Sequence, residues 1–181
     1  EIEIYKKNTH PNLMTIIGSF QASTHKYYIS ELGETLDYQS FLKNHSLIDL
    51  IKDVLSGLNY LEENHITHRD IKLGNIVKVG DFFKIIDFGV STKYIESEPI
   101  DLKPPLDKRT SVINEQFLSQ KGTKTYIPPE RWNNPNDVLK SDVYALGITI
   151  MNILFQKSLE DVDIFKENNI YQDYMRQGIS D

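Results

Sequence analysis

The strongest periodic signal in the chain lies between Leu47 and Asn64, where apolar residues recur at three- and four-residue steps. This spacing puts them on one face of a helix, so it predicts an amphipathic helix over 47–64. A second apolar run, Val143–Phe155, has almost no polar face, which is typical of a helix buried on all sides. The apolar residues of the first helix are Leu47, Ile48, Leu50, Ile51, Val54, Leu55, Leu58 and Leu61.

Two pairs of shorter apolar runs predict β-hairpins, because each pair is rich in strand-forming residues and is joined by a short polar stretch. The pairs are Leu13–Phe20 with Lys26–Leu32, and Ile76–Val79 with Phe82–Ile86. The second pair turns at Gly80-Asp81, a dipeptide typical of a tight turn. The sequence therefore mixes helices with antiparallel strands.

The rest of the chain carries weaker signals. We expect the end of an amphipathic helix over residues 1–9 and short helices over Leu36–Leu42, after Pro128 and from Asn169 to Arg176. The segment from Val90 to Ile127 contains three prolines and many polar residues, which predicts mostly irregular structure. A loop of that length in a compact domain is usually functional or mobile.

The composition narrows the class of protein. Hydrophobic residues make up 39% and charged residues 25% of the 181 residues, which indicates one globular domain or part of a larger one. The formal net charge of -6 argues against a general nucleic-acid binder, and the absence of cysteine excludes a disulfide framework and thiol catalysis. The longest apolar run, Ala145–Phe155, is too short to cross a bilayer, and no signal-peptide pattern is present. We therefore expect an intracellular, cytoplasmic protein without membrane insertion, and leave its oligomeric state open.

A loop that follows the predicted helix at 47–64 carries the candidate chemistry. It offers a carboxylate at Asp70, an ammonium at Lys72 and a carboxamide at Asn75. These groups can respectively accept a proton from a hydroxyl nucleophile, offset charge on a phosphoryl group and give an oxygen ligand to Mg²⁺. Asp87, after the second hairpin, is another candidate ligand. The alternatives are a solvated ion pair for the first two residues and an ordinary turn aspartate for Asp87.

Four motifs give the chain a resemblance to the eukaryotic protein kinase family. They are His68-Arg69-Asp70-x-Lys72-x-x-Asn75, Asp87-Phe88-Gly89, Gly122-Thr123-x-x-Tyr126-x-Pro128-Pro129-Glu130 and Ser141-Asp142. The third motif has Pro128 where the family usually has alanine. The resemblance implies an α+β, bilobal kinase-like fold. Residues 1–32 would be a remnant of the small lobe and hinge, and 33–181 most of the mainly helical large lobe, through about its G helix.

The same resemblance implies roles for individual residues. The catalytic set would be Asp70, Lys72, Asn75 and Thr123; the nucleotide-binding set Glu31, Leu32, Val77 and Asp87; and the Mg²⁺ ligands Asn75 and Asp87. The structural and regulatory set would be Glu1, His68, Arg69, Phe88, Gly89, Ser119, Glu130 and Asp142. Within it, His68 is expected to pack under Phe88, and Asp142 to brace the catalytic loop. Lys72 and Thr123 together favour serine/threonine over tyrosine specificity, with dual specificity as the alternative.

Three members of the regulatory set depend on partners. Glu1 would pair with a lysine on an upstream strand, and Glu130 with an arginine from later helices. Phosphorylation of Ser119 would order the long segment through Arg69, because a guanidinium fork suits a phosphate. An ordinary loop serine is the alternative, and Thr110 and Ser111 are other candidates for the modification.

The resemblance implies an ATP-dependent protein serine/threonine kinase that uses Mg²⁺, with Asp70 as the catalytic base and a protein as substrate. The glycine-rich loop and strand lysine of the family are absent from the 181 residues. We therefore expect a fragment of a larger kinase domain with negligible activity on its own. The alternative is a pseudokinase or truncated binding module. A small-molecule phosphotransferase is disfavoured by Gly122–Glu130, which resembles a peptide-substrate platform.

Overall fold

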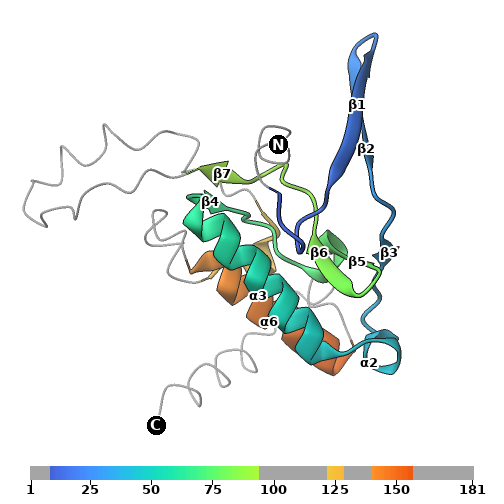
Figure 1. Ribbon diagram of the computed structural model, residues 1–181. Helices are drawn as coiled ribbons and strands as arrows, with labels where there is room; N and C mark the ends of the chain where they lie inside the picture. The colour runs from blue at the N-terminus through green and yellow to red at the C-terminus, as the bar shows by residue number, and fades with distance from the viewer. Residues whose placement is uncertain (1–8, 94–121, 129–139, 157–181) are drawn as a thin grey trace, which may run out of the picture.

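The computed structural model describes residues 9–93, 122–128 and 140–156 (Figure 1). Several predicted features lie outside these residues: the helix end over 1–9 except its last residue, the helix opening near Pro128 and the helix at 169–176. Most of the segment from Val90 to Ile127 also lies outside them. In the parts of the chain that are described, no helix has the length and apolar character needed to span a bilayer.

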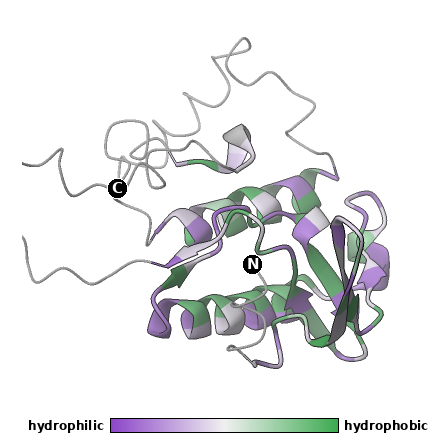
Figure 2. Ribbon diagram, turned by 90° about the horizontal axis from the view of Figure 1, so that it is seen from above, coloured by the Kyte–Doolittle hydropathy of each residue, from purple (hydrophilic) through white to green (hydrophobic). Residues whose placement is uncertain are grey.

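Helix α3 (Leu47–Glu63) confirms the strongest sequence prediction. Its first turn is capped by Ser46, whose hydroxyl accepts a hydrogen bond from the backbone N–H of Asp49 at 3.2 Å. The helix buries one apolar stripe and ends where His65 takes a left-handed conformation with φ of 57°. Figure 2 shows hydrophobic and hydrophilic residues alternating around the helices, as an amphipathic pattern requires.

Both predicted hairpins form. The first consists of β1 (Ile16–Ala22) and β2 (His25–Ser30), which project away from the rest of the described chain (Figure 1). The second consists of β5 (Ile76–Val79) and β6 (Phe82–Ile85), which β3 (Glu34–Thr35) extends to a three-stranded sheet in the order β3-β5-β6. A third pair, β4 (Ile66–Thr67) with β7 (Thr92–Lys93), flanks the candidate catalytic loop.

The short helix predicted over 36–42 is wrong in its position, because α2 spans Phe41–Asn44 instead. The Asp37 side chain accepts hydrogen bonds from both the backbone N–H and the hydroxyl of Ser40, at 3.0 and 2.9 Å. This local turn uses the residues that would have formed the first helical turn. Phe41 is fully buried and anchors α2 to the core.

Helix α6 (Ser141–Phe155) packs against α3, α2 and the 3₁₀ turn η3 (Lys124–Tyr126), and lies beside α3 in Figure 1. The prediction of burial on every side is wrong for Val143, Leu154 and Phe155, which are all more than half exposed. A continuous apolar run carries no periodicity that could mark an exposed face. The core between α6, α3 and the β3-β5-β6 sheet consists of residues such as Leu50, Leu61, Ile71, Phe83, Ile85 and Ile153.

Candidate active site

The loop between β4 and β5 holds the candidate catalytic residues, and α6 fixes its backbone. The Asp142 carboxylate accepts hydrogen bonds from the backbone N–H groups of His68 at 2.7 Å and of Arg69 at 2.8 Å. Arg69 is buried and takes a left-handed conformation with φ of 74°. Ile71 and Leu73 are buried in the core, so the loop is anchored on both sides of Asp70.

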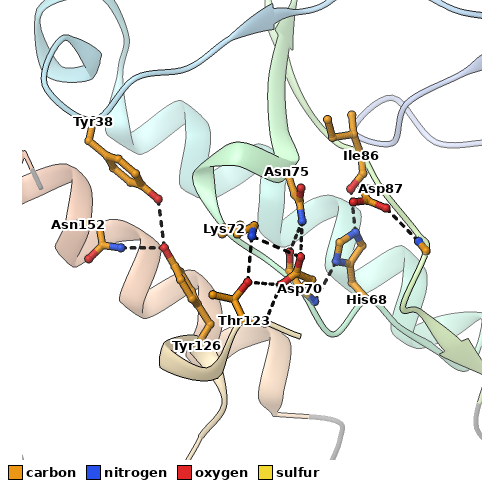
Figure 3. A network of polar contacts seen from close by, with 11 residues as sticks. Tyr38, His68, Asp70, Lys72, Asn75, Ile86, Asp87, Thr123, Tyr126 and Asn152 are labelled. Atoms are coloured by element: carbon orange, nitrogen blue, oxygen red, sulfur yellow. Dashed lines mark hydrogen bonds and ion pairs between the residues drawn. The ribbon is translucent and has the colours of Figure 1, made fainter. Parts of the chain in front are cut away.

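The Asp70 carboxylate lies at the centre of a polar network (Figure 3). Its Oδ1 accepts hydrogen bonds from the Thr123 hydroxyl at 2.8 Å and the Thr123 backbone N–H at 3.0 Å. Its Oδ2 accepts one from Asn75 Nδ2 at 2.8 Å, and the same amide nitrogen donates to the Asp70 carbonyl oxygen at 2.8 Å. Lys72 Nζ donates to the Thr123 hydroxyl oxygen at 2.9 Å and lies 3.7 Å from Asp70 Oδ2.

These contacts control the charge of Asp70. Burial by itself would raise the pKa of this carboxyl group, but the hydrogen bonds from Thr123, the positive charge of Lys72 and the Asn75 amide outweigh it and hold the pKa below its ordinary value. Asp70 is therefore ionised at neutral pH. Its two oxygens are aimed by bonds from separate parts of the chain.

Gly122 lets the Thr123 segment approach the loop. Its φ is 117°, and a Cβ atom at this position would lie only 2.5 Å from the carbonyl oxygen of Arg69. Any other residue would push the backbone away from the loop or adopt a strained conformation. Glycine here allows Thr123, the next residue, to reach Asp70 through both its hydroxyl and its N–H.

The register of the β5–β6 hairpin brings Asn75 and Asp87 to one end. Ile76 pairs with Ile85, and the backbone N–H of Ile86 donates to the Asn75 carbonyl oxygen at 2.9 Å. Asp87 follows directly, with φ of 64°, and its Oδ1 accepts a hydrogen bond from the N–H of Gly89 at 3.1 Å. The structure therefore brings Asp70, Asn75 and Asp87 together at the mouth of the hairpin (Figure 3).

The donor set at this point fits a hard cation. Asn75 donates through Nδ2 to Asp70, which leaves its amide oxygen as the atom that can face a metal ion. Asp87, which follows the other strand of the same hairpin, offers carboxylate oxygens. Mg²⁺ is usually held by one or two protein oxygens together with water and substrate phosphates, so two residues suffice. Within the described residues no group of three or more His, Asp or Glu side chains could hold a metal ion without such help.

His68 is buried below this site. Its ring meets the Phe88 ring edge to face with centroids 5.0 Å apart, its Nε2 donates to the Ile86 carbonyl oxygen at 3.0 Å, and its Nδ1 accepts from the Asp70 N–H at 3.3 Å. Burial lowers the pKa of His68, against the opposing effect of the Asp142 charge. The imidazole is therefore neutral, with its proton on Nε2, and positions the loop and Ile86.

The predicted nucleotide residues are less closely gathered. The Glu31 carboxylate accepts hydrogen bonds from Lys84 Nζ at 2.6 Å and from the Thr15 N–H at 2.9 Å. Leu32 is 94% exposed, whereas Val77 is buried against Gly33, where a Cβ would lie 2.6 Å from the valine side chain. Glu1, Ser119 and Glu130 lie outside the described residues, so their roles stay predictions.

Sequence reasoning missed two groups of residues. Lys84 is almost fully buried, and a single lysine inside an apolar strand was a signal that it needs an acidic partner. A second group joins three distant elements: the Tyr126 hydroxyl lies 3.1 Å from the Tyr38 hydroxyl and accepts from Asn152 Nδ2 at 2.8 Å. No local sequence pattern marks these last contacts.

Comparisons with known proteins agree with this site. A family model described as protein kinase domain matches residues 1–179. Among curated relatives, the serine/threonine-protein kinase PLK4 of Aedes aegypti is 27% identical over 90% of this chain and 20% of its own length. The PLK4 proteins of Drosophila sechellia (30% identical, 85% of this chain, 19% of the relative) and Xenopus tropicalis (29%, 92%, 17%) are similar.

The chain thus spans about one fifth of the length of these relatives. The family match covers nearly the whole chain, and it confirms both the resemblance stated from the motifs and the α+β kinase-like fold. This chain belongs to the protein kinase domain family.

Proposed function

We propose that the protein containing this chain is a serine/threonine protein kinase that transfers the γ-phosphate of ATP to a protein hydroxyl. The single observation that supports this most is the Asp70 carboxylate, held by Thr123 and Asn75 next to Asp87. A base, a cation-binding pair and a lysine at one point are the groups that phosphoryl transfer requires. The relatives' names, serine/threonine-protein kinase, agree with it.

In the proposed reaction Asp70 orients the acceptor hydroxyl and takes its proton. The lowered pKa of Asp70 makes it a weak base, so it acts mainly by alignment and accepts the proton as the nucleophile loses it. Lys72, next to Asp70 and Thr123, offsets charge on the transferred group. The residues thus contribute positioning and electrostatic stabilisation rather than covalent chemistry.

Asn75 and Asp87 are the proposed ligands of Mg²⁺, which when bound would neutralise charge on the ATP phosphates. Glu31, Leu32 and Val77 are the proposed contacts of the nucleotide base. Leu32 has an exposed side chain, and Val77 and Gly33 pack together beneath the same stretch of chain. The proposed contacts with the nucleotide base therefore come from the backbone of 31–32 and not from the Glu31 side chain, because that carboxylate is already bound to Lys84.

A preference for serine and threonine acceptors is supported by the contact between Lys72 and Thr123. The Thr123 hydroxyl accepts from Lys72 and donates to Asp70, so it joins the two residues closest to the acceptor. An acceptor side chain whose size or shape displaced Lys72 would therefore also displace Asp70. This arrangement makes acceptor choice depend on the geometry of the loop.

A non-catalytic kinase-like binding module is the second candidate. It is favoured by the absence of a Gly-x-Gly-x-x-Gly loop and its strand lysine from the 181 residues. Without these groups the α- and β-phosphates lack their usual support. We therefore expect negligible phosphotransfer from the 181-residue chain alone.

The test is a phosphotransfer assay with Mg-ATP and a generic protein acceptor. It compares the 181-residue chain with a protein that includes whatever coding sequence lies upstream of Glu1. We expect activity only in the second protein, and a loss of about 100-fold or more on Asp70→Asn. Asp81→Asn is the matched control, because Asp81 is exposed in the turn between β5 and β6 and its substitution should leave activity unchanged.

One outcome would contradict the proposal, and another would contradict only the expectation that the 181-residue chain alone is inactive. Absence of phosphotransfer from the longer protein, with intact ATP binding, would favour the binding module. Strong activity of the 181-residue chain that Asp70→Asn abolishes would instead show that the missing support for the phosphates is unnecessary.

A further inference from the structure

We propose that Tyr38 is a positioning residue that acts through Tyr126 to hold Thr123 on Asp70. The inference rests on the proposed function for its catalytic consequence, but its structural content stands on contacts of this chain alone. Three elements meet at one hydroxyl group: the connection between β3 and α2, the turn η3 and helix α6 (Figure 3).

The Tyr126 hydroxyl is held from two sides. Asn152 Nδ2 donates to it at 2.8 Å, and the Tyr38 hydroxyl lies 3.1 Å away. Because the Tyr126 oxygen accepts from Asn152, its own proton can be donated to Tyr38. The three groups therefore form a chain of hydrogen bonds in which each hydroxyl has a defined partner.

Because two of the three residues are buried, these hydrogen bonds restrict the position of Tyr126. Asn152 is fully buried and Tyr126 is 3% exposed. The Asn152 Oδ1 atom is buried without a hydrogen-bond partner in the described part of the chain, so the amide keeps its place through the bond to Tyr126. Loss of that bond would leave a second buried polar atom unpaired, which is costly. Asn152 and Tyr38 thus hold the Tyr126 hydroxyl in one position from two sides.

Tyr126 passes this constraint to Thr123. The backbone N–H of Tyr126 donates to the Thr123 carbonyl oxygen at 2.9 Å, which closes the turn η3. Thr123 lies at the start of that turn, and both its N–H and its hydroxyl donate hydrogen bonds to Asp70 Oδ1. A shift of the tyrosine ring would therefore move the turn and weaken both bonds to Asp70.

Tyr38 also belongs to the side of the chain proposed to bind the nucleotide. It follows β3 by three residues, and in β3 Thr35 pairs with Val77 while the preceding Gly33 packs on the same valine. Because only two residues separate Tyr38 from the end of β3, a displacement of this strand would also move Tyr38. The contact with Tyr126 thus connects the nucleotide side of the site with the acceptor side.

The experiment measures amide hydrogen exchange of the 181-residue chain by NMR, which requires no catalysis. Tyr38→Phe removes only the hydroxyl, and we expect the Thr123 amide to exchange about tenfold faster, because local opening becomes easier. The amide of Phe83, which donates to Asp53 Oδ2 at 2.7 Å, should be unchanged. Tyr27→Phe, on the exposed hairpin, is the matched control and should alter neither amide.

A double-mutant cycle tests the route. In the Tyr126→Phe background the partner hydroxyl is gone, so Tyr38→Phe should cause no further change at Thr123. Unchanged Thr123 exchange in Tyr38→Phe, equal acceleration at Thr123 and Phe83, or full additivity with Tyr126→Phe would each overturn the inference.

The catalytic consequence is measured in the longer protein. There Tyr38→Phe should lower kcat by about tenfold with little change in KM for ATP, because the acceptor side is loosened. An unchanged kcat would overturn the positioning role. If Thr123 exchange responds as expected but the wild-type protein transfers no phosphate, the contact is established and the proposed function fails instead.

Discussion

The carboxylate of Asp142 holds the backbone N–H of Arg69 at 2.8 Å, across 73 residues of sequence. The same carboxylate binds the N–H of His68 at 2.7 Å, so both of its oxygens accept from consecutive peptide groups. Arg69 is left-handed, which costs about 1–2 kcal/mol for a residue with a side chain. The buried anion of α6 therefore stabilises a loop conformation that the chain would not adopt alone.

Asp142→Asn should destabilise the protein by about 2–4 kcal/mol, because one charged acceptor becomes an NH₂ group facing an N–H donor. Urea unfolding followed by circular dichroism measures the loss. Asp49→Asn, in the exposed first turn of α3, is the matched control and should cost less than about 1 kcal/mol. Equal effects of the two changes would show that the bonds to His68 and Arg69 contribute little.

Gly122→Ala should separate Thr123 from Asp70. The new Cβ would lie 2.5 Å from the Arg69 carbonyl oxygen, and φ of 117° is unfavourable for alanine. We expect a loss of stability of about 1–3 kcal/mol and a rise in the pKa of Asp70 toward its ordinary value, since the Thr123 bonds hold it down. Carboxyl ¹³C NMR titration follows Asp70 directly.

Gly147→Ala is the control for Gly122→Ala. Gly147 lies in α6, and apart from the helix's own backbone and the two neighbouring residues no atom of the described residues lies within 4 Å of an added Cβ. Alanine is the better helix former there, so stability should rise by about 0.5–1 kcal/mol and the pKa of Asp70 should stay low. If the pKa of Asp70 stays as low in Gly122→Ala as in the wild type, the turn can move away from the loop without losing the contact between Thr123 and Asp70.

The elements that the sequence predicted correctly depend on local pattern. Helix α3 follows from its apolar stripe and the Ser46 cap, and the β5–β6 hairpin from two apolar runs around Gly80. The hairpin register then brings Asn75 next to Asp87 without further information. The close grouping of these two residues with Asp70 was thus largely contained in short-range sequence.

The contacts that the sequence did not predict join distant segments. Tyr38, Tyr126 and Asn152 come from three elements, and nothing near any of them marks the other two. The position of α2 depended on one side-chain turn at Asp37, which competes with helix formation at a cost too small to read from composition. The bracing by Asp142 was expected only through family resemblance, because its partners are backbone groups.

Stability should fall as the pH drops below the ordinary histidine pKa of 6.5. Burial lowers the pKa of His68 in the folded protein, so between the two pKa values the unfolded chain binds a proton that the folded chain excludes. The contribution of His68 to the free energy of unfolding is therefore fully present above pH 6.5. It declines below that pH, by at most about 1.4 kcal/mol per pH unit.

Urea unfolding between pH 5 and 7.5 measures this slope. His68→Gln should flatten it, whereas His25→Gln, in the exposed β1–β2 hairpin, should leave it unchanged. Some slope will persist in His68→Gln, because burial also lowers the pKa of His10. An unaltered slope in His68→Gln would mean that His68 is protonated at no cost in the folded state.

Lys84→Met should destabilise the protein through Glu31. The ammonium lies 2.6 Å from Glu31 Oε1 and, against the effect of burial, lowers the pKa of this carboxyl group. Its removal leaves a partly buried carboxylate bonded to the Thr15 N–H, at a cost of about 1–3 kcal/mol at pH 7. That cost should shrink as the pH is lowered from 7 toward 3, because protonation of Glu31 removes the unpaired charge; Lys52→Met, on the exposed face of α3, should be neutral at both pH values. The same loss at pH 3 and pH 7 would show that Lys84 stabilises by packing alone.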